Sequence, residues 1–332
     1  MQPTLRCNPP QSSTTPPIPI TSNSSYVIVD TGQVQSYDNT AEITVPALGD
    51  AFYGQDAQFQ SAQPSHVDNE DGTVTDLNTG LMWQQNPGDK MPWSDGMASA
   101  DSFNLAGYDD WRLPTIKELY SLIIFSGIDC SGYEGTDTSS LVPFIDTDYF
   151  EFEYGDESVG ERIIDSQFAT CTEYVSTTMG GHHTMFGVNF ADGRIKGYGT
   201  DPLPGQTENS QFFVLYVRGN TDYGINDFTD NGDGTIIDSA TELMWSQDDS
   251  GEGMNWEDAL SWVQQKNEEN YLGHNDWRLP NAKELQSILD YSMSLATTTS
   301  AAIDPLFDVT TITDEGGETN YPFIGLVLLM GV

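Results

Sequence analysis

The chain has 332 residues, the length of two domains with an additional segment. Hydrophobic residues make up 37% of it and aromatic residues 11%, which is enough to build cores and excludes a wholly disordered chain. With 51 acidic and 11 basic residues the net charge is −40, so the surface repels nucleic acids and anionic lipid headgroups and excludes both as partners.

The N-terminal region differs in composition from the rest of the chain. Residues 1–25 are rich in Pro, Ser and Thr without hydrophobic periodicity, which predicts an extended linker. Residues 26–66 contain "SYVIVDTGQ" and "AEITVPAL", which are typical of short strands separated by turns. No signal peptide is visible at Met1. The apolar stretch Ile324–Val332 is much shorter than the roughly 20 residues of a membrane span, so we expect no transmembrane segment.

An internal duplication begins near residue 67. "DNEDGTVTDLNTGLMW" (68–83) aligns without a gap with "DNGDGTIIDSATELMW" (230–245), and "DDWRLPTIKEL" (109–119) recurs as "NDWRLPNAKEL" (275–285). The order of these blocks is the same in both copies, which predicts a tandem domain duplication. We place the domains at 67–220 and 228–332.

Each copy has the pattern of an α+β domain. The Asp-Gly pairs are tight-turn dipeptides between short strands, and a lone Trp then opens a helix. The helix predicted from Trp256 to Asn267 has an apolar stripe at helical spacing and Asn255 as its cap. In the repeated phrase we expect Pro114 and Pro280 at the start of a second helix, where a missing N–H costs nothing.

The second copy stops early. The first continues through "GVNFADGRIKGYG" and "LYVRG", which are typical of strands, and we find no equivalents of them in the second. The sequence therefore predicts an incomplete second domain. Either the chain is truncated or read through a frameshift, or another segment completes its sheet.

The repeated phrase allows two interpretations. Arg112 and Arg278 either contact an anionic ligand or act as internal clamps that bond carbonyls and pair with a carboxylate. A ligand contact need not be duplicated, so recurrence in both copies favours the structural role. The predicted structural motif comprises Trp83, Trp111, Arg112, Pro114, Trp245, Trp277, Arg278 and Pro280.

The Asp-rich turns raise the question of calcium. An EF-hand loop needs Gly at its sixth position and Glu at its twelfth, and neither copy provides them. Calcium is the one cofactor that these residues suggest, in a looser site, although Asx turns in a hairpin explain the same residues. The candidate ligands are Asp68, Asp71 and Asp76 in the first copy and Asp230, Asp233 and Asp238 in the second.

Other chemistry has little support. Cys130 and Cys171 lie in the same domain and could form a disulfide, while Cys7 is either a free thiol or a link to another molecule. No arrangement of Ser, Cys or His suggests a nucleophile, and no phosphate-binding loop is present. We therefore assign no catalytic residue and expect no enzymatic activity.

The blocks "DNxDGT…LMW", "DWRLPTxKEL", "NFADG" and "VRG", in this order, resemble the Lcl C-terminal domain family. The resemblance covers residues 67–219 fully and 229–290 well. It implies a C-type-lectin-like fold, in which short helices flank a small twisted antiparallel sheet, and a secreted or surface-displayed bacterial protein without enzymatic activity. The adhesin that names the family binds sulfated glycosaminoglycans, a ligand that 11 basic residues do not favour here.

Two functions follow from this resemblance and the incomplete second copy. The first is an extracellular binding or adhesion protein that presents a glycan- or protein-binding surface. The alternative is a subunit of an extracellular fibre, in which strand exchange between neighbouring copies completes the second domain. Because the Trp residues recur in pairs, we expect ligand contacts in the variable loops 129–165 and 179–211.

Overall fold

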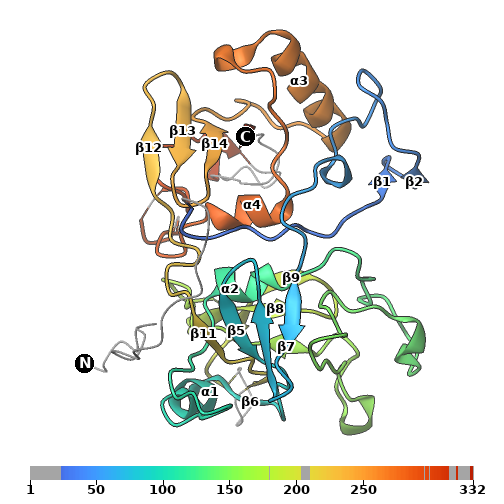
Figure 1. Ribbon diagram of the computed structural model, residues 1–332, viewed down its shortest axis with the longest axis vertical. Helices are drawn as coiled ribbons and strands as arrows, with labels where there is room; N and C mark the ends of the chain where they lie inside the picture. Colours follow the sequence, from blue (N-terminus) through green and yellow to red (C-terminus); the bar gives the residue numbers. More distant parts are fainter. Residues whose placement is uncertain are drawn as a thin grey trace. The chain divides into compact units, whose positions relative to one another are not determined.

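The computed structural model describes residues 24–178, 180–202, 210–294, 296–298, 300–313, 319–320 and 330–331. The described residues form two compact units (Figure 1). The first unit contains Pro64–Tyr223. The second begins again at Gly224 and also includes the N-terminal segment up to Gln63. Most of the predicted 1–25 linker lies outside the described residues.

The first unit is built around an antiparallel four-stranded sheet of order β11-β5-β4-β3. Its hairpin turns at Gly72, whose φ of 85° lies in the left-handed region that favours glycine. These strands are β3 (His66–Asp68), β4 (Thr73–Asp76), β5 (Leu81–Gln84) and β11 (Val217–Gly219). Smaller sheets pair β6 (Met91–Pro92) with β10 (Gln211–Phe212), and β7 (Gln167–Phe168) with β8 (Thr184–Asn189) and β9 (Arg194–Gly199).

The first unit also contains two short α-helices, α1 (Trp93–Ala100) and α2 (Ile116–Ser121), and two 3-10 turns, η2 (Thr138–Ser140) and η3 (Glu157–Val159). The main core cluster contains Trp93, Trp111 and Phe212, and Trp83 on β5 is fully buried. Burial of aromatic side chains of this size supplies much of the free energy that stabilises a small domain.

The second unit repeats this plan. Its sheet has the order β12-β13-β14-β17, with strands β12 (Phe228–Asp230), β13 (Thr235–Asp238), β14 (Leu243–Ser246) and β17 (Met330–Gly331). Its helices are α3 (Trp256–Glu268) and α4 (Ala282–Ser287). Two further pairs are β1 (Ser36–Tyr37) with β2 (Glu42–Ile43), and β15 (Ile312–Thr313) with β16 (Thr319–Asn320). The molecule is thus α+β, with several small antiparallel sheets and few helices.

The fourth strand of the second sheet corrects one prediction. Met330 lies opposite Trp245, just as Val217 lies opposite Trp83 in the first unit. The expectation that the second domain lacks an equivalent of the "LYVRG" strand is therefore wrong, since β17 occupies that position. The sequence did not reveal it because the segment reads "LMGV", without the Arg-Gly pair of the first copy.

The N-terminal segment is an integral part of the second unit. The Ser25 amide donates to the Ala240 carbonyl over 2.9 Å, and Tyr26 is only 1% exposed. Buried Lys283 on α4 donates its Nζ to the Asp30 carbonyl oxygen at 2.9 Å, and Figure 1 shows the blue segment running beside this helix. The fibre hypothesis assumes that a neighbouring copy supplies the missing strand of the second sheet. In the described residues β17 of the same chain takes that position, and the N-terminal segment docks on its own second unit.

Candidate binding clefts and the duplicated corner

The repeated phrase forms a corner between a strand bridge and a capped helix. In the first unit Arg112 exchanges both backbone hydrogen bonds with Val217. Its guanidinium then donates to both carboxylate oxygens of Glu118, at 2.7 and 2.5 Å. Glu118 also accepts the Thr115 amide at 2.8 Å, and the Thr115 side chain accepts the Glu118 amide, which makes a capping box.

The second unit has the same corner. Arg278 bonds Met330 through the backbone and Glu284 through both guanidinium nitrogens, at 2.8 and 2.5 Å. Asn281 replaces Thr115 as the cap. The Arg278 and Glu284 side chains are 9% and 4% exposed, so a bidentate ion pair is buried here. Both arginines are thus engaged internally and hold the helix to the sheet edge.

The prolines and tryptophans of the motif support this corner. Pro114 and Pro280 lie one residue before the helix caps Thr115 and Asn281, so the expectation that they occupy the first helical position is wrong by two residues. Each indole N–H of Trp111 and Trp277 donates to a carbonyl six residues earlier, at 3.3 and 2.9 Å. All four motif tryptophans, Trp83, Trp111, Trp245 and Trp277, are at most 2% exposed.

The Asp residues proposed for calcium serve as turn acceptors. Asp71 and Asp233 each accept the amide and the hydroxyl of a Thr two residues later. The hydrogen bonds from Thr235, chiefly that from its hydroxyl, lower the pKa of Asp233. Asp68, Asp76 and Asp230 accept nearby backbone amides, and Asp238 is buried among four donors. Within the described ranges, no three His, Cys, Asp or Glu side chains are grouped so that they could hold a metal ion.

The predicted disulfide between Cys130 and Cys171 is wrong. Cys130 is a free, buried thiol that donates to the Ala191 carbonyl oxygen at 3.3 Å, in a small cluster with Ile163. Cys171 is disulfide-bonded and packs in the main core cluster of the unit. The two cysteines thus belong to different parts of the core, which sequence spacing alone does not reveal. Cys7 lies outside the described residues.

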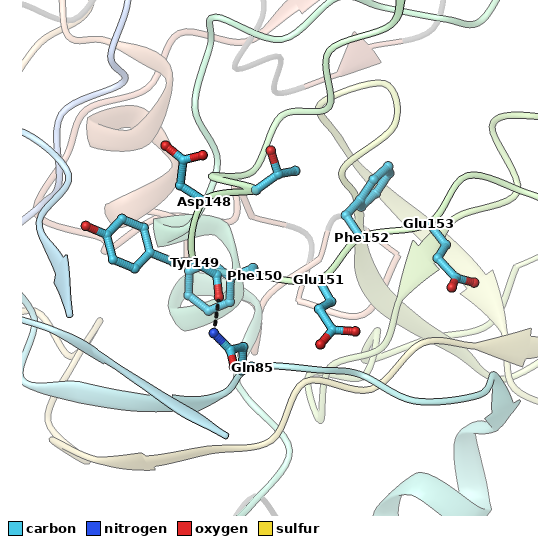
Figure 2. Close-up of a pocket in the computed structure, with 8 residues that line it drawn as sticks. Gln85, Asp148, Tyr149, Phe150, Glu151, Phe152 and Glu153 are labelled. Carbon is cyan, nitrogen blue, oxygen red and sulfur yellow. Dashed lines mark hydrogen bonds between the residues drawn. The ribbon is translucent and has the colours of Figure 1, made fainter. Parts of the chain in front are cut away.

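A groove opens in the first unit along Thr147–Glu153, inside the variable loop 129–165. It has a volume of about 430 Å³ and is lined by these seven residues and Gln85. Figure 2 shows the side chains of Tyr149, Glu151 and Glu153 projecting from one extended stretch, with Gln85 donating to the Tyr149 carbonyl at 3.0 Å. Aromatic rings next to carboxylates make a surface suited to polar, uncharged or cationic ligands.

The backbone frame of this groove is itself duplicated. Gln247, the equivalent of Gln85, donates to the Leu306 carbonyl at 3.0 Å, and its own carbonyl accepts the Asp308 amide as that of Gln85 accepts Glu151. Phe307 packs on Phe228 in this second frame. The sequence signal was present in "IDTDYFEF" and "IDPLFDV" but is too short to recognise without the flanking blocks.

A second, larger cleft of about 580 Å³ lies in the second unit. The N-terminal segment, α3 and the repeated phrase each provide one wall. This cleft was not predicted, because no pattern in the sequence indicates that residues 24–63 fold against the second copy. The lining is Leu48, Gly49, Tyr53, Gly54, Phe59, Leu260, Val263, Gln264, Asn267, Glu268, Asn275, Asp276, Trp277 and Arg278.

The fold and these sites define a tandem pair of α+β units, each with an Arg–Glu corner. Residues 72–218 and 234–323 both match the Lcl C-terminal domain model, and together they make up more than half of the chain. The protein therefore belongs to the Lcl C-terminal domain family, in tandem duplication. No curated protein and no solved structure matches the chain. In the part of the chain that the structure describes, no helix is long and apolar enough to cross a membrane.

Proposed function

We propose that this chain is a non-enzymatic extracellular bacterial binding protein whose C-type-lectin-like units bind uncharged glycans. Membership of the Lcl C-terminal domain family supports the location and the class. The open clefts combine aromatic rings with hydrogen-bonding groups, as glycan sites require. The duplicated corner contributes stability rather than ligand contacts, since its arginines are engaged by glutamates.

The observation that carries the choice of ligand is the state of the basic side chains. A sulfated glycan needs accessible cations, because sulfate recognition depends on Arg and Lys. Of the ten basic side chains among the described residues, eight already pair with carboxylates and a ninth, Lys283, donates to a buried carbonyl. The eight are Lys90, Arg112, Arg162, Arg194, Lys196, Arg218, Lys266 and Arg278. At a net charge of −40, sulfate and carboxylate groups are also repelled at long range.

The test is a glycan array of neutral, sialylated and sulfated oligosaccharides, probed with the full chain in calcium and again in chelator. We expect binding to neutral glycans in both conditions. Tyr149→Ala removes an aromatic wall of the first groove and should weaken the signal from that site, with Tyr133→Ala, outside the groove, as the matched control. A preference for sulfated glycans, or silence in both conditions, contradicts the proposal.

A further inference from the structure

Three features of the second unit's cleft differ from the first unit or are added to it. The first feature is the length of its helix. α3 has 13 residues where α1 has 8, and the additional turn brings Glu268 to the rim. The second feature is the wall that residues 48–59 of the N-terminal segment provide.

The third feature is the carboxylate of Asp276, which lacks the arginine partner that its equivalent has in the first unit. In the first unit Asp110 of the repeated phrase binds the Arg218 guanidinium at 2.6 and 3.1 Å, and that guanidinium lies 3.8 Å from the centre of the Tyr108 ring. The strand registers place Gly331 where the first unit has Arg218, since Gly331 lies opposite Met244 and Arg218 opposite Met82. Asp276, the equivalent of Asp110, therefore lacks this arginine and lines the cleft exposed.

The walls of the cleft are fixed by side-chain amides. Gln264 on α3 accepts the Gly49 amide at 2.9 Å and donates to the Asp50 carbonyl at 3.3 Å, which ties the N-terminal segment to the helix. Asn267 bonds both the amide and the carbonyl of Trp277, at 2.7 and 2.8 Å. These amides are therefore used in building the cleft and not in binding.

The groups left to meet a ligand are of two kinds. Tyr53 and Phe59 are half-buried aromatic rings that line one wall, and the Arg278 guanidinium already lies over the Phe59 ring, 5.5 Å from its centre. Glu268 and Asp276 are exposed carboxylates on the rim, and Arg278, the one cation in the lining, is engaged by Glu284. Carboxylates accept strong hydrogen bonds from hydroxyls, whereas aromatic faces cover apolar C–H surface. A saccharide presents both kinds of surface.

We propose that this cleft is a second saccharide site, specific for sugars without sulfate or carboxylate groups, and that Asp276 and Glu268 accept its hydroxyls while Tyr53 packs on a sugar face. The proposal rests on the glycan-binding function proposed above. Two carboxylates at the rim repel an anionic ligand and select an uncharged one. The cleft is complete only when the N-terminal segment is docked, so the segment is part of the binding site.

The test uses the full chain on the same neutral glycan array, followed by calorimetric titration of the strongest neutral oligosaccharide. Asp276→Asn and Glu268→Gln keep the shape of the cleft and should each weaken binding at this site about tenfold, with Glu257→Gln on the same helix, outside the cleft, unchanged. Gly331→Arg restores the arginine of the first unit and should abolish binding at this site by pairing with Asp276. Thermal unfolding of each variant identifies any loss of folding.

The outcomes separate this inference from the proposed function. If the unchanged protein binds neutral glycans and Tyr149→Ala alone reduces the binding, the function stands and the second site is overturned. If all three cleft variants remain folded and bind like the unchanged protein, the second site is equally overturned. If the unchanged protein binds no neutral glycan, both proposals fail. A roughly tenfold weaker affinity at one of two sites in Asp276→Asn, together with a fall from two bound sugars to one in Gly331→Arg, supports the second site.

Discussion

The corner of the second unit provides the sharpest stability prediction. Glu284 accepts two guanidinium bonds from Arg278 and the Asn281 amide at 2.7 Å, and it is only 4% exposed. Glu284→Ala leaves the Arg278 charge buried without its counter-ion, a change that costs about 3–5 kcal/mol, and it also removes half of the capping box. We expect the second unit to unfold at clearly lower urea concentration, since whole domains are stabilised by only about 5–15 kcal/mol.

The assay is urea unfolding followed by tryptophan fluorescence, since Trp245 and Trp277 are both buried in this unit. Replacing both partners, Arg278→Met with Glu284→Leu, should cost less than Glu284→Ala alone, because no unpaired charge remains buried. Glu257→Gln on α3 serves as the control: this side chain is half-buried and accepts a hydrogen bond from the Asn39 amide at 3.4 Å, which can also donate to a glutamine, so the free energy of unfolding should change by less than about 0.5 kcal/mol. If Glu284→Ala costs no more than this control, the corner is not the structural clamp that its geometry indicates.

Three further results are expected. Hydrogen bonds from Ser61 and Gly32 outweigh burial and lower the pKa of Asp30, so its carboxylate stabilises the docked segment above the unfolded pKa near 3.8 and this stabilisation is lost as the pH falls through the lower folded value. Asp30→Asn should therefore reduce the loss of stability at acidic pH, as measured by unfolding at a series of pH values. An unchanged loss of stability contradicts the assignment. Alkylation in denaturant without reductant, read by mass spectrometry, should label Cys130 and not Cys171; labelling of both would show that Cys171 is not in a disulfide. Chelator should leave the melting temperature unchanged within about 1 °C, because the turn aspartates accept protein N–H and O–H groups, whereas a larger drop would reveal a metal-stabilised turn.

The duplication and the two-unit plan could be predicted from the sequence because they rest on long blocks with a fixed order. The arginine of the corner was expected to meet a carboxylate, but its partner was not identified. Glu118 and Glu284 lie six residues further along, a spacing that matches no single element and arises from the turn before the helix. Local patterns do not reach across such a turn.

The features that the sequence did not reveal depend on long-range pairing. β17 is two residues long and is recognised only by its register against β14. The docking of residues 24–63 joins positions more than 200 apart, as in the Lys283 bond to Asp30. The second cleft follows from that docking and from the replacement of Arg218 by Gly331, so neither its wall nor its free carboxylate could be predicted from the chain alone.

The most direct test of the central claim is a crystal structure of the full chain with the neutral oligosaccharide that binds most strongly on the array. If binding resides where the two copies differ, the sugar will lie in the cleft between Tyr53 and Asp276 or in the groove beside Tyr149. The Arg112–Glu118 and Arg278–Glu284 pairs will remain closed in the complex. A sugar seated on either arginine, with its glutamate displaced, would contradict the account.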